Sequence, residues 1–338
     1  MAHRELGQLD LADGLIGRKL GANETLERIS ALLDWPSIER LLAVLHAKVR
    51  GAPSYPPLMM VKALLLAQWH GLSDGRLEDA LADRLSFRRF VGISLGDASP
   101  DEVTIWRFRQ DLQRAGLAEK LFTEINRQIA ERGLILRRGT LVDATLVDAQ
   151  VRRPPLRKSP PAPPDAPPGT TTIKPPSKLE RSARDPDAAW TRKRGKLHFG
   201  YKGHVGVDQS SGIIRTAEFT PANVNETTVA DKLMSGDEAA LYGDAAYDTK
   251  ARRARLRRNG VTDGLMHRAN KHHPLSAEQT EHNRMLNRTR CAVERVFAVL
   301  KRHYGWRRVR YLGLARNAAH FLLLCTAINL RRLAVLAT

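Results

Sequence analysis

The chain has 338 residues, enough for one large domain or two ordinary domains with buried cores. It carries 55 Lys and Arg against 36 Asp and Glu, a formal net charge of +19, so its charge favours a polyanion such as nucleic acid as partner. A membrane partner would need an amphipathic anchor or a spanning segment, and the sequence shows neither. Its two cysteines, Cys291 and Cys325, are too few for a disulfide framework and favour a reducing cytoplasm.

The first 133 residues are predicted to be helical. Residues 24–50 and 57–70 have apolar side chains at helical spacing, and glycine and proline residues separate the two segments. A turn at 71–75 leads into one or two further helices. We therefore expect an N-terminal helical segment at 1–50 and a helical domain at 51–133.

The segment 99–102, Ser-Pro-Asp-Glu, predicts the start of another helix, with Ser99 as N-cap and Glu102 completing a capping box. Arg107 and Arg109 lie near the beginning of this helix. A short helix, a turn and a capped helix with arginines are typical of a helix-turn-helix that reads DNA. The alternative, with equal weight, is a helical bundle with a solvated basic face.

From residue 134 the pattern changes to strands. Residues 134–149 are rich in Val, Leu and Thr, which predicts a strand or hairpin. The stretch 151–176 contains ten of the chain's 18 prolines, so we expect a solvated basic linker at 151–189. Beyond it, 196–208 and 212–224 have the period of two that is typical of strands, with a hairpin turn between them.

The remaining segments alternate between helix and strand. This order predicts a mixed α/β sheet with helices on its faces, in which an antiparallel meander is followed by strands joined through helical crossovers. Such a domain would comprise residues 134–150 and 190–338. The predicted helices are 224–236, 249–260, one around residue 294 and 315–337, and the predicted strands are 238–248 and 261–268.

Three acidic residues have an unusual context. Asp143 lies in the middle of an apolar strand, where a carboxylate needs a partner or a metal. Asp244 closes another strand, and Glu294 is the one carboxylate in a basic and apolar helix, NRTRCAVERVFAVLK. If the two strands are neighbours and the helix crosses the sheet, the three carboxylates converge and would repel one another without a cation. Carboxylate oxygens select Mg²⁺ or Mn²⁺, and a pair of such ions supports displacement at phosphorus.

Other carboxylates compete for this role. They are Asp148, Asp208 and Asp248.

On the helix, Asn287, Arg290, Glu294 and Lys301 share one narrow polar stripe beside the apolar face, at about 100° per residue. Arg290 and Lys301 would hold a DNA phosphate next to the metals. The alternative is an ordinary ion pair between Arg290 and Glu294, which adds a few tenths of a kcal/mol to a surface helix.

Several segments together resemble the transposases of bacterial insertion sequences that have a DDE active site. NRTRCAVERVFAVLK has their Arg-x3-Glu-x6-Lys spacing, and LVDATLVDA and LYGDAAYD are similar to their two Asp blocks. HFGYKGHVGVD followed by TPANVNE resembles the stretch between those blocks in insertion-sequence family five. The helical segment from residue 55 resembles the domain that these transposases carry ahead of the core. The resemblance covers about residues 50–310.

The resemblance implies a ribonuclease-H-like core with Asp143, Asp244 and Glu294 as catalytic and metal-binding residues, and two Mg²⁺ ions per site, or Mn²⁺. It also implies binding of terminal inverted repeats, cleavage of the element ends and joining of 3′-hydroxyls to target DNA. The predicted DNA contacts are Arg290, Lys301, Asn287, Lys202, His198, Arg107 and Arg109. At Asn287 the related families have Tyr, so a stacking role is not carried over to this position.

Two alternatives remain open at this point. One is an inactive, DNA-binding regulator derived from a transposase, and the other is a nuclease of the same fold that cuts without joining. For the transposase, the expected partners are double-stranded DNA and a second copy of the chain, in a homodimer or higher oligomer that brings two ends together. No membrane partner is expected, and the expected location is the bacterial cytoplasm, at the nucleoid.

Overall fold

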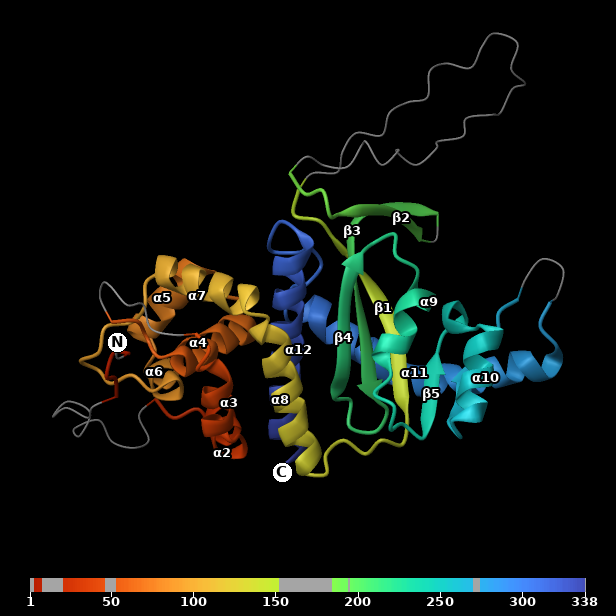
Figure 1. Ribbon diagram of the computed structural model, residues 1–338, viewed down its shortest axis with the longest axis horizontal. Helices are drawn as coiled ribbons and strands as arrows, with labels where there is room; N and C mark the ends of the chain where they lie inside the picture. Colours follow the sequence, from red (N-terminus) through yellow and green to blue (C-terminus); the bar gives the residue numbers. More distant parts are fainter. Residues whose placement is uncertain are drawn as a thin grey trace, which may run out of the picture.

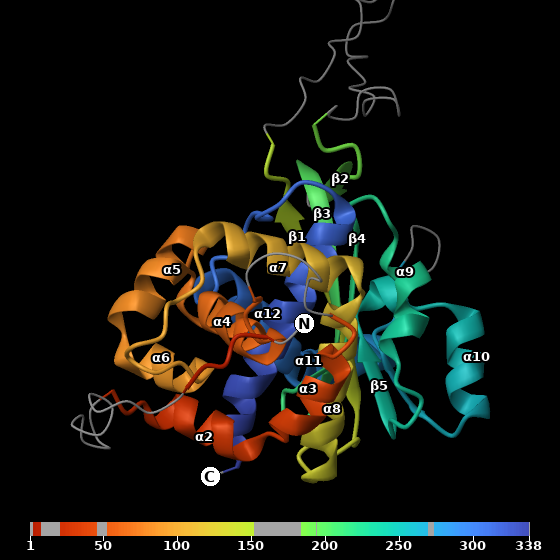
Figure 2. The same cartoon turned by 60° about the vertical axis from the view of Figure 1, so that its left-hand side comes forward.

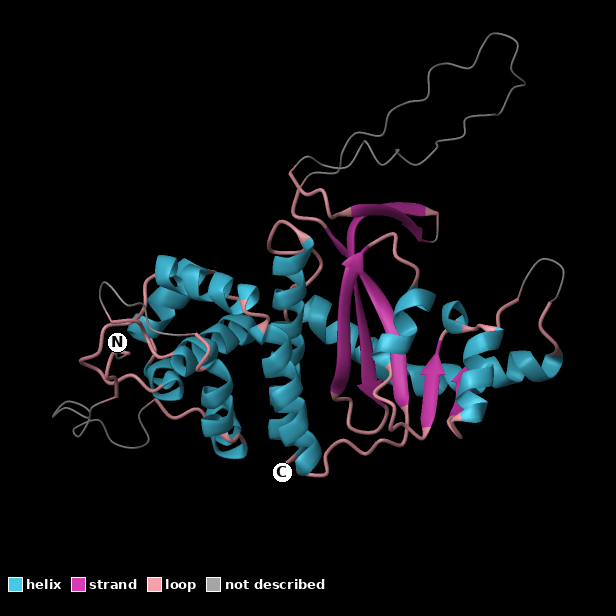
Figure 3. Ribbon diagram, in the orientation of Figure 1, coloured by secondary structure: helices cyan, strands magenta, loops and turns pink. Residues whose placement is uncertain are grey.

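The computed structural model describes residues 3–7, 21–45, 53–151, 184–193, 195–269 and 274–337. Within them, helices fill one side of the molecule and a sheet occupies the other (Figure 3). Helices α8 (Leu117–Glu131) and α12 (Leu314–Leu336) stand between the two parts (Figure 1). Most of the predicted linker, residues 152–183, lies outside the described residues.

The helical part is built around α4 (Pro57–His70), which packs against several of its neighbours (Figure 2). Because α4 is apolar on nearly every side, it can only be stable when other helices surround it. The predicted helix at 57–70 is thus confirmed. The other helices of this part are α2 (Glu24–Leu32), α3 (Trp35–Leu42), α5 (Asp74–Asp83), α6 (Leu85–Val91) and α7 (Glu102–Arg114).

Two sequence predictions in this part are wrong in detail. The helical stretch predicted from residue 24 breaks between α2 and α3, because Asp34 caps α3 by accepting a hydrogen bond from the Ser37 backbone N–H. The N-cap of α7 is Asp101, whose carboxylate accepts from the Thr104 backbone N–H at 2.6 Å. Ser99 therefore lies before the helix, and the capping box predicted from it does not form.

The sheet has six strands in the order β2-β3-β1-β5-β6, with β4 also paired to β3. Strand β1 is central, between antiparallel β3 and parallel β5. The antiparallel pairing of β1, β3 and β4 is the meander that the sequence predicted. Strands β2 and β4 share the outer edge of β3. The strands are β1 (Thr140–Asp148), β2 (Ala189–Lys193), β3 (Lys196–Asp208), β4 (Ile214–Pro221), β5 (Ala240–Gly243) and β6 (Thr262–Leu265).

Helices cover both faces of the sheet, which confirms the predicted mixed α/β architecture. On one face, α8, α12 and α11 (Ala277–Arg302) enclose a core that includes Leu141, Tyr201 and Phe297. On the other face, α9 (Glu226–Val229), the following 3-10 helix and α10 (Lys250–Arg258) cover Val142 and Leu241. Since side chains alternate between the faces of a strand, odd-numbered residues of β1 face α11.

Helix α12 contributes to the core of the helical part and to the core between the sheet, α8 and α11. It is long and apolar enough to cross a membrane, but 72% of its most apolar stretch is buried inside the protein, which is typical of a core helix. Its Ala327 carbonyl accepts a hydrogen bond from the Trp69 indole of α4 at 2.8 Å. On the other side, Asn329 is fully buried and bonds to the backbone N–H and C=O of Ile214 in β4 and to the Asn126 side chain of α8.

We predict that Asn329→Leu destabilises the whole molecule. The change keeps the bulk of the side chain but leaves the buried Ile214 N–H without its acceptor, at a cost of about 2–4 kcal/mol. Chemical denaturation followed by circular dichroism measures the effect. The exposed Arg331→Ala on the same helix is the control and is expected to change stability by less than about 0.5 kcal/mol. Equal effects of the two changes would contradict the role given to Asn329.

Candidate functional site

Two aspartates lie side by side where β5 ends. Val142 of β1 pairs with Gly243 of β5 in a parallel register, so the next residues along each strand, Asp143 and Asp244, are neighbours. Asp143 faces α11, because it shares the parity of Leu141, which packs into the core on that side. The register therefore brings together two residues that are about a hundred positions apart in the sequence.

Asp143 is a largely buried carboxylate whose side chain is 18% exposed. Its Oδ1 accepts a hydrogen bond from the Ala144 N–H at 2.7 Å, and its Oδ2 lies 3.4 Å from Nη2 of Arg290. Burial raises the pKa of Asp143 to about 6, although Arg290 opposes the rise and Asp244 adds to it. The charged form of such a carboxylate is stabilised by any additional cation that approaches it.

Asp244 is held by the turn that follows β5. Its Oδ1 accepts a hydrogen bond from the Ala246 N–H at 2.9 Å and caps the short 3-10 helix Ala245–Tyr247. The Tyr247 side chain is fully buried, and its hydroxyl has no hydrogen-bond partner among the described residues. Burial raises the pKa of Tyr247 well above its usual value, and the charges of Asp143 and Asp244 raise it further. This tyrosine therefore remains neutral beside the two aspartates.

Arg290 approaches the aspartates from α11. Its guanidinium is buried, with Nη1 3.3 Å from the Met266 sulfur, and its Nε has no hydrogen-bond partner among the described residues. The alternative interpretation of the helix was an ion pair between Arg290 and Glu294, but among the described residues Arg290 pairs with Asp143 instead. In this arrangement Arg290 is the cation that faces the paired aspartates.

Glu294 follows Arg290 by one helical turn, about 6 Å along the axis, and its side chain is exposed. Among the described residues, no group of three His, Cys, Asp or Glu side chains is close enough to hold a metal ion. The structure thus brings Asp143 and Asp244 together but does not bring Glu294 into one cluster with them. Asn287, one turn before Arg290, is also exposed.

A groove of about 750 Å³ lies alongside this site, between the end of β1, the β2–β3 hairpin and the C-terminal part of α11. We call it the basic groove. Its cationic lining residues are Lys193, Lys196, Lys301, Arg302, Arg307 and the titratable His198. Thr145 and Phe297 also line it. Lys301 is half-buried, and burial together with Lys193 and Arg307 lowers its pKa.

Two of the residues predicted to contact DNA are buried and form ion pairs within the protein. Lys202 is 6% exposed and forms an ion pair with Glu226 at 2.8 Å and a hydrogen bond to the Val224 carbonyl. Arg109 is 7% exposed and forms a two-pronged ion pair with Asp74 that joins α7 to α5. In this conformation both cations are paired with partly buried carboxylates, so the structure offers neither of them to DNA, and their predicted DNA contacts stay predictions.

Two other predicted contacts are accessible. Arg107 is exposed on α7, next to Trp106, whose side chain is 48% exposed. His198 lines the basic groove, with its Nδ1 3.9 Å from a carboxylate oxygen of Asp148.

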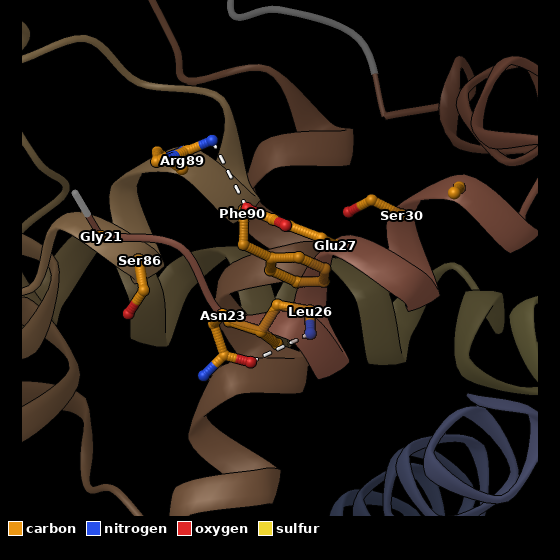
Figure 4. Close-up of a pocket in the computed structure, with 9 residues that line it drawn as sticks. Gly21, Asn23, Leu26, Glu27, Ser30, Ser86, Arg89 and Phe90 are labelled. Atoms are coloured by element: carbon orange, nitrogen blue, oxygen red, sulfur yellow. Dashed lines mark hydrogen bonds and ion pairs between the residues drawn. The ribbon is translucent and has the colours of Figure 1, made fainter. Parts of the chain in front are cut away.

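A second cavity, of about 420 Å³, lies between α2 and α6 in the helical part (Figure 4). Its polar lining is used within the protein: Asn23 caps α2 through the Leu26 N–H, and Glu27 lies 3.4 Å from Arg89. The cavity brings no carboxylate cluster or row of cations together. It offers no chemistry comparable to that of the paired aspartates.

Sequence reasoning missed several residues around the site. Lys193, Lys196 and Arg307 line the basic groove, but strand β2 was not predicted and so its hairpin was not placed. The sequence contains a signal for this hairpin turn, because Gly195 lies among basic residues in 192–196. In the structure this glycine has a positive φ. Tyr247 was read as part of a strand, whereas it ends the short helix that Asp244 caps.

Comparison with known families gives two matches. Residues 135–330 match the family described as transposase DDE domain, and residues 16–111 match the family described as transposase domain (DUF772). The first match covers more than half of the chain and includes Asp143, Asp244 and Glu294. The second covers α2 to most of α7. No solved structure was found to match the chain.

We predict that Asp143→Asn stabilises the protein at alkaline pH in metal-free buffer. A carboxyl group whose pKa is raised by folding stabilises the protein below its unfolded value, and this contribution is lost as the pH rises through about 6. Asparagine remains neutral, so the variant should gain about 1–3 kcal/mol over the parent at pH 8. Near pH 3, where the carboxyl group is protonated in both the folded and the unfolded protein, the difference should almost vanish.

Thermal unfolding at both pH values, with a chelator present, measures this gain. The control is the exposed Asp79→Asn on α5, whose effect should be the same at both pH values. A lower melting temperature for Asp143→Asn at pH 8 would show that Arg290 stabilises the charged form more than burial opposes it.

Proposed function

This chain belongs to the transposase DDE domain family, and from that premise we propose that it binds the terminal inverted repeats of a mobile element, cleaves the element ends and joins their 3′-hydroxyls to target DNA. The family is one of metal-dependent enzymes that cleave and transfer DNA. We further propose that the element belongs to insertion-sequence family five, from the resemblance of residues 198–208 and 220–226 to that group. A bacterial protein with this role works in the cytoplasm, at the nucleoid.

The observation that carries the proposal is the pairing of Asp143 with Asp244 on the sheet face that α11 covers. Arg290 of α11 touches Asp143, and Glu294 lies one turn further along the same helical stripe. Beyond Glu294, this stripe continues through Ala298 to Lys301, and both of these line the basic groove. Glu294 therefore lies between the aspartates and the groove.

The paired aspartates suit a hard divalent cation. Two neighbouring carboxylates, one of them buried with a raised pKa, form an oxygen donor set whose charge Arg290 compensates only in part. We propose that Asp143, Asp244 and Glu294 hold two Mg²⁺ ions, with Mn²⁺ as a substitute. When bound, such ions activate a water or a 3′-hydroxyl and stabilise the leaving oxygen at phosphorus.

The protein's own residues position the DNA at this site. Lys301, half-buried in the basic groove, presents an ammonium to a phosphate next to the carboxylates. Arg290 is only 9% exposed, so we propose that it contacts a DNA phosphate after releasing Asp143, whose Oδ2 lies 3.4 Å from its Nη2. Asn287, exposed one turn earlier, extends the same stripe and can hydrogen-bond to the sugar-phosphate backbone.

The helical part supplies recognition in this proposal. Arg107 and Trp106 are exposed in the first half of α7, a helix held against α5 by the partly buried Arg109–Asp74 ion pair. Such a rigid, arginine-bearing helix suits the reading of a terminal repeat. Because two element ends must be brought together, we propose that at least two copies of the chain act on one element.

We predict that Glu294→Gln abolishes cleavage of element ends while binding to them is retained. The change removes a charge from the proposed metal site but preserves the helix and its size, so a loss of at least about 100-fold in cleavage rate is expected. A gel assay with labelled end DNA in Mg²⁺ measures cleavage, and mobility shift in chelator measures binding.

The matched control is Glu278→Gln in the first turn of α11, which is exposed and lies far along the helix from Asp143. It should cleave at the parental rate. If Glu294→Gln also cleaves at that rate, the third carboxylate has been assigned to the wrong residue. If Glu294→Gln cuts no DNA but the parent cuts without joining, the chain is a nuclease of this fold.

We predict that Arg107→Ala weakens binding to element ends by about 5- to 100-fold, because an exposed arginine that contacts a base edge contributes about 1–3 kcal/mol. Competition between end DNA and unrelated DNA measures the loss. The control is Arg114→Ala, at the other end of α7, whose partner Asp111 is itself exposed. An unchanged end affinity in Arg107→Ala would remove Arg107 from the DNA interface.

A further inference from the structure

Asp244 lies in a turn that leaves the sheet at the end of β5. We call residues 244–247 the Asp244 turn. Asp244 Oδ1 accepts a hydrogen bond from the Ala246 N–H at 2.9 Å, and the Tyr247 N–H donates to the Asp244 carbonyl at 3.0 Å. Among the described residues, Oδ2 of Asp244 has no hydrogen-bond partner. The orientation of this carboxylate therefore depends on where the backbone of Ala246 is held.

Two side chains from outside the turn hold its carbonyl groups. The Thr227 hydroxyl of α9 donates to the Ala246 carbonyl at 2.8 Å. Nη1 of Arg252 in α10 donates to the Tyr247 carbonyl at 2.6 Å, and its Nη2 donates to the Thr227 carbonyl at 2.8 Å. These bonds close a triangle between α9, α10 and the Asp244 turn, and α9 packs against the turn beside the end of β5 (Figure 1).

Arg252 is fixed within this triangle. Its side chain is 5% exposed, and its Nε lies 3.2 Å from a carboxylate oxygen of Asp231. Because a guanidinium is planar and rigid, it fixes its several partners relative to one another. The Thr227 backbone is thus held in place independently of the bond that the Thr227 hydroxyl makes.

Helix α9 is also anchored to the sheet, by residues of the segments HFGYKGHVGVD and TPANVNE. Lys202 of β3 forms an ion pair with Glu226 at 2.8 Å, and its Nζ donates to the Val224 carbonyl at 2.7 Å. Asn225 caps α9 by accepting from the Thr227 N–H at 3.0 Å. The segment that presents the Thr227 hydroxyl is therefore fixed to β3 just where α9 begins.

We propose that Thr227 is a positioning residue for Asp244: its hydroxyl holds the Ala246 backbone, whose N–H orients the Asp244 carboxylate towards a divalent cation shared with Asp143. The proposal rests on the proposed function and adds a support to its metal site. Groups that orient a metal ligand raise metal affinity, because the ligand then need not be ordered when the ion binds. Lys202 and Glu226 serve the same end, since they hold the helix that carries Thr227.

The test is the Mn²⁺ affinity of Thr227→Val. Valine keeps the shape of threonine but cannot donate to the Ala246 carbonyl. Loss of a group that orients a metal ligand weakens metal binding by about 10- to 100-fold, and we expect about 10-fold because Arg252 still holds the turn. Titration of the full chain with Mn²⁺, followed by electron paramagnetic resonance, measures the affinity without DNA. Asp143→Asn identifies the part of the binding that belongs to this site.

Two variants serve as controls. Thr227→Ser keeps the hydroxyl and should restore the parental affinity. Thr228→Val removes an exposed hydroxyl that donates to the Asn225 carbonyl at 2.8 Å, inside the same turn of α9, and should leave the affinity unchanged. Both valine variants lose one hydroxyl hydrogen bond, so they should melt at similar temperatures in chelator. Equal Mn²⁺ affinities in Thr227→Val and Thr228→Val would overturn the proposal.

Cleavage of end DNA separates this result from the catalytic assignment. In Thr227→Val, the Mn²⁺ concentration for half-maximal cleavage should rise about 10-fold, and the rate at saturating ion should stay within about threefold of the parent. Glu294→Gln should instead lose the rate at every ion concentration. A parent that neither binds Mn²⁺ nor cleaves would overturn the proposed function and this inference with it. A parent that does both, with Thr227→Val indistinguishable from Thr228→Val, would overturn this inference alone.

Discussion

The parallel pairing of β1 with β5 is the constraint on which the site depends. It places Asp143 beside Asp244, and the central position of β1 buries the first of these under α11. Burying carboxylates next to each other costs free energy unless cations approach them. In the described conformation Arg290 provides part of that compensation, and the raised pKa of Asp143 shows that the compensation is incomplete. The fold thus holds negative charge at one place that a bound cation would stabilise.

Helix α11 determines which side chains lie next to the paired aspartates. Its apolar face packs on the sheet through residues such as Val293 and Leu300, and this packing fixes which side chains border the aspartates. The polar stripe beside that face then places Arg290 at Asp143 and Lys301 in the basic groove. One helix therefore aligns the proposed third carboxylate with both the aspartates and the basic groove.

The excess of basic residues serves two different purposes. Some cations are buried, neutralise partly buried carboxylates and hold elements together, as Arg109 does with Asp74 and Lys202 does with Glu226. Others, such as Lys193 and Arg107, remain exposed and available to a polyanion. Composition reports only the sum of these two groups. The second group lies on two separate surfaces, one in the helical part and one beside the sheet, which suits a protein that must both recognise DNA and act on it.

The sequence by itself determined the local periodicities and the blocks that carry the chemistry. Strand β3 has the predicted bounds, 196–208, and Asp143 lies within a strand as expected, because alternation and apolar spacing are properties of neighbouring residues. The tertiary structure alone decided which charges are accessible, and that Arg290 contacts Asp143 while Glu294 remains exposed. Burial and ion pairing depend on segments distant in the chain, and no spacing within a single segment encodes them.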